Sequence, residues 1–111
     1  MFIKLRNLLL IFIFGAVIAS SCQYEKLLKS TDYKLKYNKA IEYYNAEDYE
    51  HAIGLLEQLN PALKGTNKAD TVLYYLADAH FEQEDYILAE HHFKQFFNTY
   101  GNHRWAEKAE F

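Results

Sequence analysis

Residues 40–56 (AIEYYNAEDYEHAIGLL) return in outline as residues 77–93 (ADAHFEQEDYILAEHHF), 37 positions further along the chain. The tripeptide Glu-Asp-Tyr recurs unchanged at 47–49 and 84–86. Because one displacement also relates several pairs of apolar residues, the chain contains an internal repeat, and this repeat decides the fold. Those pairs are Ala40 with Ala77, Ala52 with Ala89, and Leu56 with Phe93.

Each repeat has the pattern of two amphipathic helices. Apolar residues keep three- and four-residue spacing in four successive stretches, as helices with one buried face require. Asp48 and Asp85 stand directly before the second helix of each pair, where a carboxylate caps free backbone N–H groups. Gly65 separates the repeats and its counterpart is Asn102, and both residue types tolerate the left-handed conformation that ends a helix. The sequence therefore predicts helical hairpins.

The placement of small and aromatic residues resembles the tetratricopeptide repeat. That repeat has a small residue in the first helix and a Tyr before an Ala in the second. The small residues let the two helices of a hairpin approach closely, and the large rings fill the space beside them. Glu47 and Glu84 stand where this repeat usually has Gly, and the longer period predicts an extended link over residues 60–67. The residues expected in the repeat core are Ala40, Tyr49, Ala52, Leu56, Ala77, Tyr86, Ala89 and Phe93.

The predicted fold is all-α: an α-solenoid of tetratricopeptide-type hairpins that follows a signal peptide. Repeat 1 is assigned to residues 34–64 and repeat 2 to residues 65–101. Residues 102–111 resemble the opening of a third repeat, since HRWAEKAEF (103–111) aligns with residues 66–74. No second helix follows to cover the apolar residues of this segment, so a truncated third repeat is expected, and with it a longer natural chain.

Residues 1–21 have the pattern of a bacterial signal peptide. Lys4 and Arg6 form a basic start, and residues 8–19 (LLLIFIFGAVIA) carry no charge. Twelve residues at about 1.5 Å each fall far short of a hydrocarbon core of about 30 Å. This length and these flanks favour an exported chain over one held by a membrane-spanning helix.

Cys22 is the chain's only cysteine and follows the small residues Ala19, Ser20 and Ser21. The stretch resembles a lipobox, although Ala19 stands where Leu is usual. The resemblance implies that Cys22 is lipidated and becomes the new N-terminus, with residues 22–33 as a linker. The alternatives are signal cleavage without a lipid and an uncleaved anchor. Several acyl chains would hold the chain on a membrane more firmly than one.

The charge balance argues against binding to nucleic acid. Without Lys4 and Arg6 the chain keeps ten basic residues against fifteen acidic ones, and no basic patch is present. An enzyme is not expected either, because the serines lie only at 20, 21 and 30 and no phosphate-binding loop occurs. Adjacent His91 and His92 point about 100° apart on a helix, so neither a metal site nor a cofactor is predicted.

The lipobox, the linker and the hairpins together resemble the BamD (YfiO, ComL) family of outer-membrane assembly lipoproteins. The likeness rests on residues 22–32 (CQYEKLLKSTD), on Tyr43-Tyr44 and on residues 85–100 (DYILAEHHFKQFFNTY). It implies a lipid-anchored scaffold on the periplasmic side of the outer membrane. The implied partners are a BamA-type barrel insertase and unfolded outer-membrane proteins, with neither catalysis nor a small-molecule substrate. The alternative is a tetratricopeptide lipoprotein that serves another envelope complex, in cell-wall synthesis, motility or uptake.

Three tyrosines fall outside the pattern of the repeat core. Tyr43, Tyr74 and Tyr75 lie on the first helices of the hairpins, which form the concave wall of tetratricopeptide arrays. They are the candidate contacts for an extended peptide, because aromatic anchors contribute strongly to such binding. Packing against a neighbouring helix explains them equally well from the sequence alone.

Overall fold

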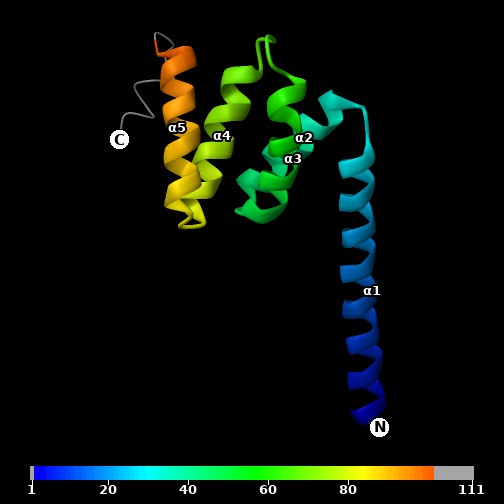
Figure 1. The fold of residues 1–111 in the computed structure, drawn as a ribbon. Coiled ribbons are helices and arrows are strands. Elements are labelled where there is room, and N and C mark those ends of the chain that lie inside the picture. Colours follow the sequence, from blue (N-terminus) through cyan, green and yellow to red (C-terminus); the bar gives the residue numbers. More distant parts are fainter. Residues whose placement is uncertain (1, 102–111) are drawn as a thin grey trace. The chain divides into compact units, whose positions relative to one another are not determined.

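The computed structural model describes residues 2–101, with side chains at 4–10 and 22–101. Over this part of the chain the structure is all-helical, without a strand (Figure 1). The predicted start of a third repeat, residues 102–111, lies outside the described residues. The helices are α1 (Phe2–Lys29), α2 (Tyr33–Asn45), α3 (Tyr49–Ala62), α4 (Ala69–Glu82) and α5 (Tyr86–Tyr100).

The chain divides into two units, of which residues 1–30 form the first and residues 31–111 the second. In the first unit, α1 runs as one helix of 28 residues through both the predicted signal peptide and Cys22. The Cys22 side chain is exposed and not in a disulfide. Within the part of the chain that the structure describes, no helix is both long and apolar enough to cross a membrane.

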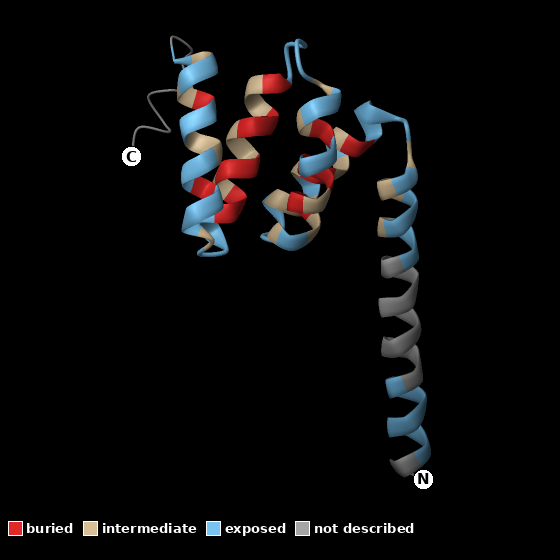
Figure 2. Ribbon diagram, in the orientation of Figure 1, coloured by how far each residue is buried: buried red, intermediate tan, exposed pale blue. Residues whose placement is uncertain are grey.

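In the second unit, α2 packs on α3, α3 on α4, and α4 on α5. Consecutive helices are therefore neighbours, which gives two hairpins, α2–α3 and α4–α5, side by side. Buried positions gather on the faces that the helices turn toward one another (Figure 2). The side chains with the least exposed surface and the largest volume are Phe96, Leu55, Leu56, Leu59, Leu76 and Val72.

Most residues expected in the repeat core lie in it, and one does not. Ala40, Ala52, Leu56, Ala77 and Ala89 are all buried. Small residues at the contact of two helices let the backbones approach, and the space beside them is filled by large side chains. Tyr49 and Phe93 are half-buried, whereas Tyr86 is 56% exposed. Tyr49 lies in a hairpin against which α4 packs, but α5, which carries Tyr86, is the last helix described.

The turns that close the two hairpins share one geometry. In the first hairpin the N–H of Asp48 donates to the carbonyl of Tyr43, and in the second the N–H of Asp85 donates to the carbonyl of His80, both at 2.9 Å. These bonds span five residues, as in the Schellman motif, and satisfy a carbonyl that the helix end leaves without a partner. The repeat seen in the sequence is therefore also a repeat of backbone structure.

The same two aspartates begin the next helix. The carboxylate of Asp48 accepts a hydrogen bond from the N–H of His51, and that of Asp85 accepts one from the N–H of Leu88, each at 3.4 Å. The capping roles predicted for Asp48 and Asp85 are thus confirmed. Each turn ends one helix and starts the next within three residues.

Glu47 and Glu84 carry the strain of these turns, with φ of 61° and 64°. A side chain in the left-handed region costs about 1–2 kcal/mol, a cost that glycine avoids. We expect Glu47→Gly or Glu84→Gly to raise the free energy of unfolding by about 1 kcal/mol, measured by urea denaturation. Gln58→Gly, at an exposed position within α3, is the control and should lower it by about 1 kcal/mol. Destabilisation by all three substitutions would contradict the prediction.

The link between the hairpins is shorter than the sequence predicts. The sequence predicts an extended link over residues 60–67, but α3 continues to Ala62 with Pro61 inside its last turn, and α4 begins at Ala69. Gly65 has φ +86°, in agreement with its expected left-handed conformation. The hydroxyl of Thr66 donates to the carbonyl of Leu63 at 2.6 Å, which closes the link locally.

Candidate functional site

Tyr44 joins the two hairpins. Its hydroxyl, on α2, donates a hydrogen bond to the carboxylate of Asp78 on α4. Its ring lies 4.6 Å from that of Tyr75 on α4, at an interplanar angle of 68°, and 5.6 Å from that of Tyr49 on α3. Edge-to-face pairs at these distances are favourable beyond the apolar area they bury. One side chain thus contacts three others, from both hairpins.

The aromatic cluster continues from α4 to α5. The ring of Tyr74 lies 5.9 Å from that of Tyr75 on the same helix. It also lies 6.2 Å from Phe93 and 6.0 Å from Phe96, both on α5. The rings therefore form a row that crosses from α2 over α4 to α5. This row of rings connects the two hairpins.

Carboxylates surround the phenol groups of this surface. Burial, then the hydrogen bond to Asp78, raise the pKa of Tyr44 well above its usual value. Burial raises the pKa of Tyr37, with further contributions from Tyr75 and the charge of Asp70. Burial likewise raises the pKa of Tyr74, with the Asp78 charge as the next cause. Phenols with raised pKa values stay neutral near pH 7 and keep the proton with which they donate hydrogen bonds.

A lysine side chain contacts the face of one tyrosine ring near these phenols. The ammonium nitrogen of Lys68 lies 4.8 Å from the centroid of the Tyr37 ring, within the range of a cation–π contact. The surface thus combines ring faces, neutral hydroxyls and carboxylates. We define the tyrosine face as Tyr37, Tyr44, Asp70, Tyr74, Tyr75 and Asp78.

The three predicted peptide contacts do not occupy one place. Tyr74 and Tyr75 belong to the tyrosine face and are half-buried in it. Tyr43 is also half-buried, but its ring lies 5.2 Å from that of His51 on α3. The structure thus brings Tyr74 and Tyr75 together with Tyr44, a residue that the sequence reasoning did not select.

Asp78 was also missed, although the repeat contains a signal for it. Its counterpart 37 positions earlier is Ile41. A carboxylate that replaces an apolar residue on the inner side of a helix needs a polar partner, and Tyr44 supplies one. A search for polar residues that break the repeat would have selected Asp78.

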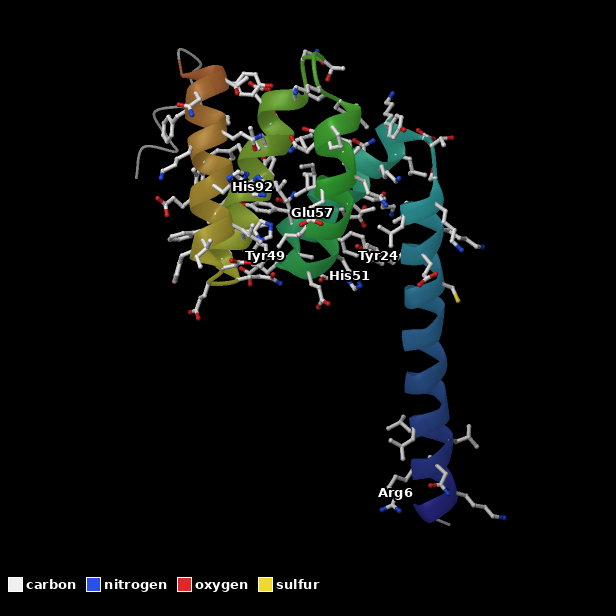
Figure 3. All side chains as sticks on the ribbon, in the orientation of Figure 1. Arg6, Tyr24, Tyr49, His51, Glu57 and His92 are labelled. Atoms are coloured by element: carbon white, nitrogen blue, oxygen red, sulfur yellow. The ribbon has the colours of Figure 1, made fainter. Side chains whose placement is uncertain are left out.

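His80 and His92 form a second polar cluster, at the junction of α3, α4 and α5. Their rings stack with centroids 5.5 Å apart at an interplanar angle of 18°. His80 is 4% exposed, and its ring nitrogens lie 3.8 Å from Glu57 and 3.6 Å from Asp85, beyond hydrogen-bond distance. Burial lowers the pKa of His92, with the nearby His80 as the next cause. Figure 3 labels Glu57 on α3 and His92 on α5.

This cluster is not arranged as a metal centre. Among the residues whose placement is described, no group of three or more His, Cys, Asp or Glu side chains is suited to hold a metal ion. A cavity of about 280 Å³ lies elsewhere, between the end of α3, the start of α4 and the end of α5. Its lining includes Lys64, Leu73 and Tyr100 but none of the residues predicted as peptide contacts.

Comparison of the chain with protein-family models, with curated proteins and with solved structures found no match. The tyrosine face offers hydrogen-bond donors, ring faces and negative charge. Such a surface is suited to binding another polypeptide.

Proposed function

We propose that the protein is a lipid-anchored scaffold of the machinery that assembles β-barrel proteins in the outer membrane. In this role it binds partner and client polypeptides without catalysing a reaction. It is held on the periplasmic side of the membrane by acyl chains on Cys22. The partners we propose are a BamA-type barrel insertase and unfolded outer-membrane proteins.

The observation that carries the proposal is the repeated hairpin. Identical turn hydrogen bonds 37 residues apart set two helix pairs in succession, with α2 and α4 both contributing to the tyrosine face. Stacked helical hairpins of the tetratricopeptide type present extended surfaces to other proteins. Their residues either pack the hairpins together or contact the bound protein. Neutral phenols beside carboxylates fit this use better than catalysis.

The lipobox-like stretch before Cys22 supports the membrane anchor. Ala19, Ser20 and Ser21 are the small residues that a signal peptidase requires beside its cleavage site. Cys22 is exposed on α1, so its thiol is accessible to a modifying enzyme. Two or more acyl chains on one residue give stable membrane attachment, which a single chain does not.

The test of the scaffold role is affinity purification of the tagged full-length protein from its own host after mild detergent extraction. We expect mass spectrometry to identify the barrel insertase as a stoichiometric partner. Tyr75→Ala should reduce the recovery of unfolded barrel proteins, while Gln58→Ala on the exposed side of α3 should not. Recovery of cell-wall, motility or uptake proteins in place of the insertase would refute the proposal.

Cys22→Ser should abolish lipid attachment, because a serine hydroxyl does not replace the cysteine thiol as the acceptor of the diacylglyceryl group. We expect complete loss of labelling by a fatty-acid analogue and retention of residues 1–21, because cleavage before Cys22 follows the lipid transfer. Ser21→Ala keeps a small residue before the cysteine and should behave like the natural sequence. Undiminished labelling of the Cys22→Ser protein would show that the lipid is attached to another residue.

A further inference from the structure

Two histidines depart from the repeat at the junction of α3, α4 and α5. His80 stands at the counterpart of Tyr43, and His92 stands at the counterpart of Leu55, each 37 positions further along the chain. Leu55 has no exposed surface, and His92 is half-buried at the same place in the second hairpin. A titratable ring therefore replaces an aliphatic side chain of the core. The first hairpin shows that the fold itself does not need a histidine at this place.

The ring nitrogens of this pair are not satisfied by hydrogen bonds. His80 is 4% exposed, and both its ring nitrogens are buried without a hydrogen-bond partner among the described residues. The same is true of Nδ1 of His92. Buried polar atoms are nearly always hydrogen-bonded, so these exceptions indicate a role other than packing. Histidine is the side chain whose charge changes between about pH 5 and 8, so that role is titration.

Carboxylates lie on two sides of His80. Its Nε2 is 3.8 Å from Glu57 on α3, and its Nδ1 is 3.6 Å from Asp85 in the turn before α5. Both carboxylates are partly exposed, so each can move the short distance to a charged ring. With His91 on α5, these are the titratable groups that the described part of the chain places beside the pair. A first proton on the pair thus meets negative charge from both hairpins.

A second proton is not neutralised in this way. The rings of His80 and His92 stack 5.5 Å apart, so two protonated rings repel each other across the contact between α4 and α5. Burial lowers the pKa of His92, and the nearby His80 lowers it further, against smaller opposing contributions from a hydrogen bond with Gln95 and from Glu57. The ring of His91 lies 5.2 Å from that of His92 and acts in the same direction as His80.

We propose that His80 and His92 form an acid-sensitive switch, which holds α5 against α4 while the pair is neutral and releases α5 when both rings are protonated. The pKa of His92 is lower in the fold than its usual 6.5. The contribution of His92 to the packing of α5 is therefore fully present above about pH 6.5 and is lost as the pH falls through the folded-state value. Release also separates the ring of Tyr74 from Phe93 and Phe96.

Hydrogen exchange of the detergent-solubilised full-length chain tests the switch at about pH 7.5 and about pH 5, the range in which histidine changes charge. After correction for the intrinsic pH dependence of exchange, we expect peptides of α5 to exchange several-fold faster in acid, and those of α2 and α3 to change less. One unit of pKa corresponds to about a tenfold change in such an opening equilibrium.

Substitutions at position 92 assign the acid response to the pair. His92→Leu, which restores the residue of the first repeat, should remove the response of α5, and so should His92→Gln. His91→Gln changes the exposed neighbour, is the matched control and should keep most of the response. Circular dichroism at about pH 7.5, where histidine is mostly neutral, verifies that each variant is folded.

Glu57→Gln provides an independent measurement, because it removes the carboxylate of α3 that faces the protonated pair. The acid response of α5 should then become larger, and a smaller response would contradict the proposal. An acid response that persists in both His92→Leu and His92→Gln would overturn it. So would the absence of a response in the natural protein, or equal acceleration in α2, α3, α4 and α5, which would indicate global unfolding.

Discussion

Phe96→Ala is expected to lower the free energy of unfolding by about 3–5 kcal/mol, the usual cost of removing a buried ring. The Phe96 side chain has no exposed surface. Its ring lies 6.0 Å from that of Tyr74 on α4 and 5.7 Å from that of Tyr100 on α5. Removal of the ring leaves a cavity between α4 and α5 and takes a partner from the tyrosine face.

Tyr86→Ala is the matched control for Phe96→Ala. Tyr86 is also an aromatic residue of α5, but it is 56% exposed, so its loss should change the free energy of unfolding by about 1 kcal/mol or less. The measurement is chemical denaturation of the two variants and the natural protein under the same conditions. Equal destabilisation by both substitutions would show that α5 packs on another face than the one described.

Tyr44→Phe is expected to have the second-largest effect, roughly 1–3 kcal/mol, because it leaves the half-buried Asp78 carboxylate without its donor. Asp78→Asn should cost less, since an amide still accepts the hydrogen bond. In a double-mutant cycle, Tyr44→Phe and Asp78→Ala should couple by about 1 kcal/mol. Additive effects of the two substitutions would mean that the bond does not hold the hairpins together.

The same pair predicts how stability depends on alkaline pH. The pKa of Tyr44 is raised in the folded state, first by burial and then by Asp78, while in the unfolded chain it is near 10. The unfolded state therefore loses this proton first. The contribution of Tyr44 is fully present below about pH 10 and decreases as the pH rises further. Denaturation series above pH 10 should show a shallower loss of stability for Tyr44→Phe than for the natural protein.

The hairpins were predictable because they depend on local chemistry that the repeat displays twice. The positions of Asp48 and Asp85 directly before a helix predict that they cap it, and the 37-residue interval between pairs of alanines predicts that these alanines are buried. The end of α3 was not predicted, because proline usually ends a helix. Pro61 is tolerated in the last turn, where the following N–H groups still find carbonyls.

The candidate site was less predictable, because it depends on contacts between residues far apart in the sequence. Tyr44 and Asp78 are 34 positions apart, and no periodicity within one helix indicates their hydrogen bond. The sequence leaves Tyr74 and Tyr75 open between peptide contact and helix packing, and the structure makes them half-buried parts of an aromatic row. The exposure of Tyr86 followed from the position of α5 and not from its place in the repeat.

The three-residue turns also determine how the helical unit responds to force. In each turn the carboxylate of a single aspartate accepts a hydrogen bond from the next helix, and its backbone N–H donates one to the end of the previous helix. The hairpin therefore cannot open without losing both bonds. The link from Leu63 to Lys68 contains the left-handed Gly65, and Lys68, which precedes α4, caps that helix with no side-chain hydrogen bond. A pull on the unit should therefore bend it between the hairpins, each of which moves as a rigid plate. A client held across α2 and α4 would sense that bend through the bond between Tyr44 and Asp78.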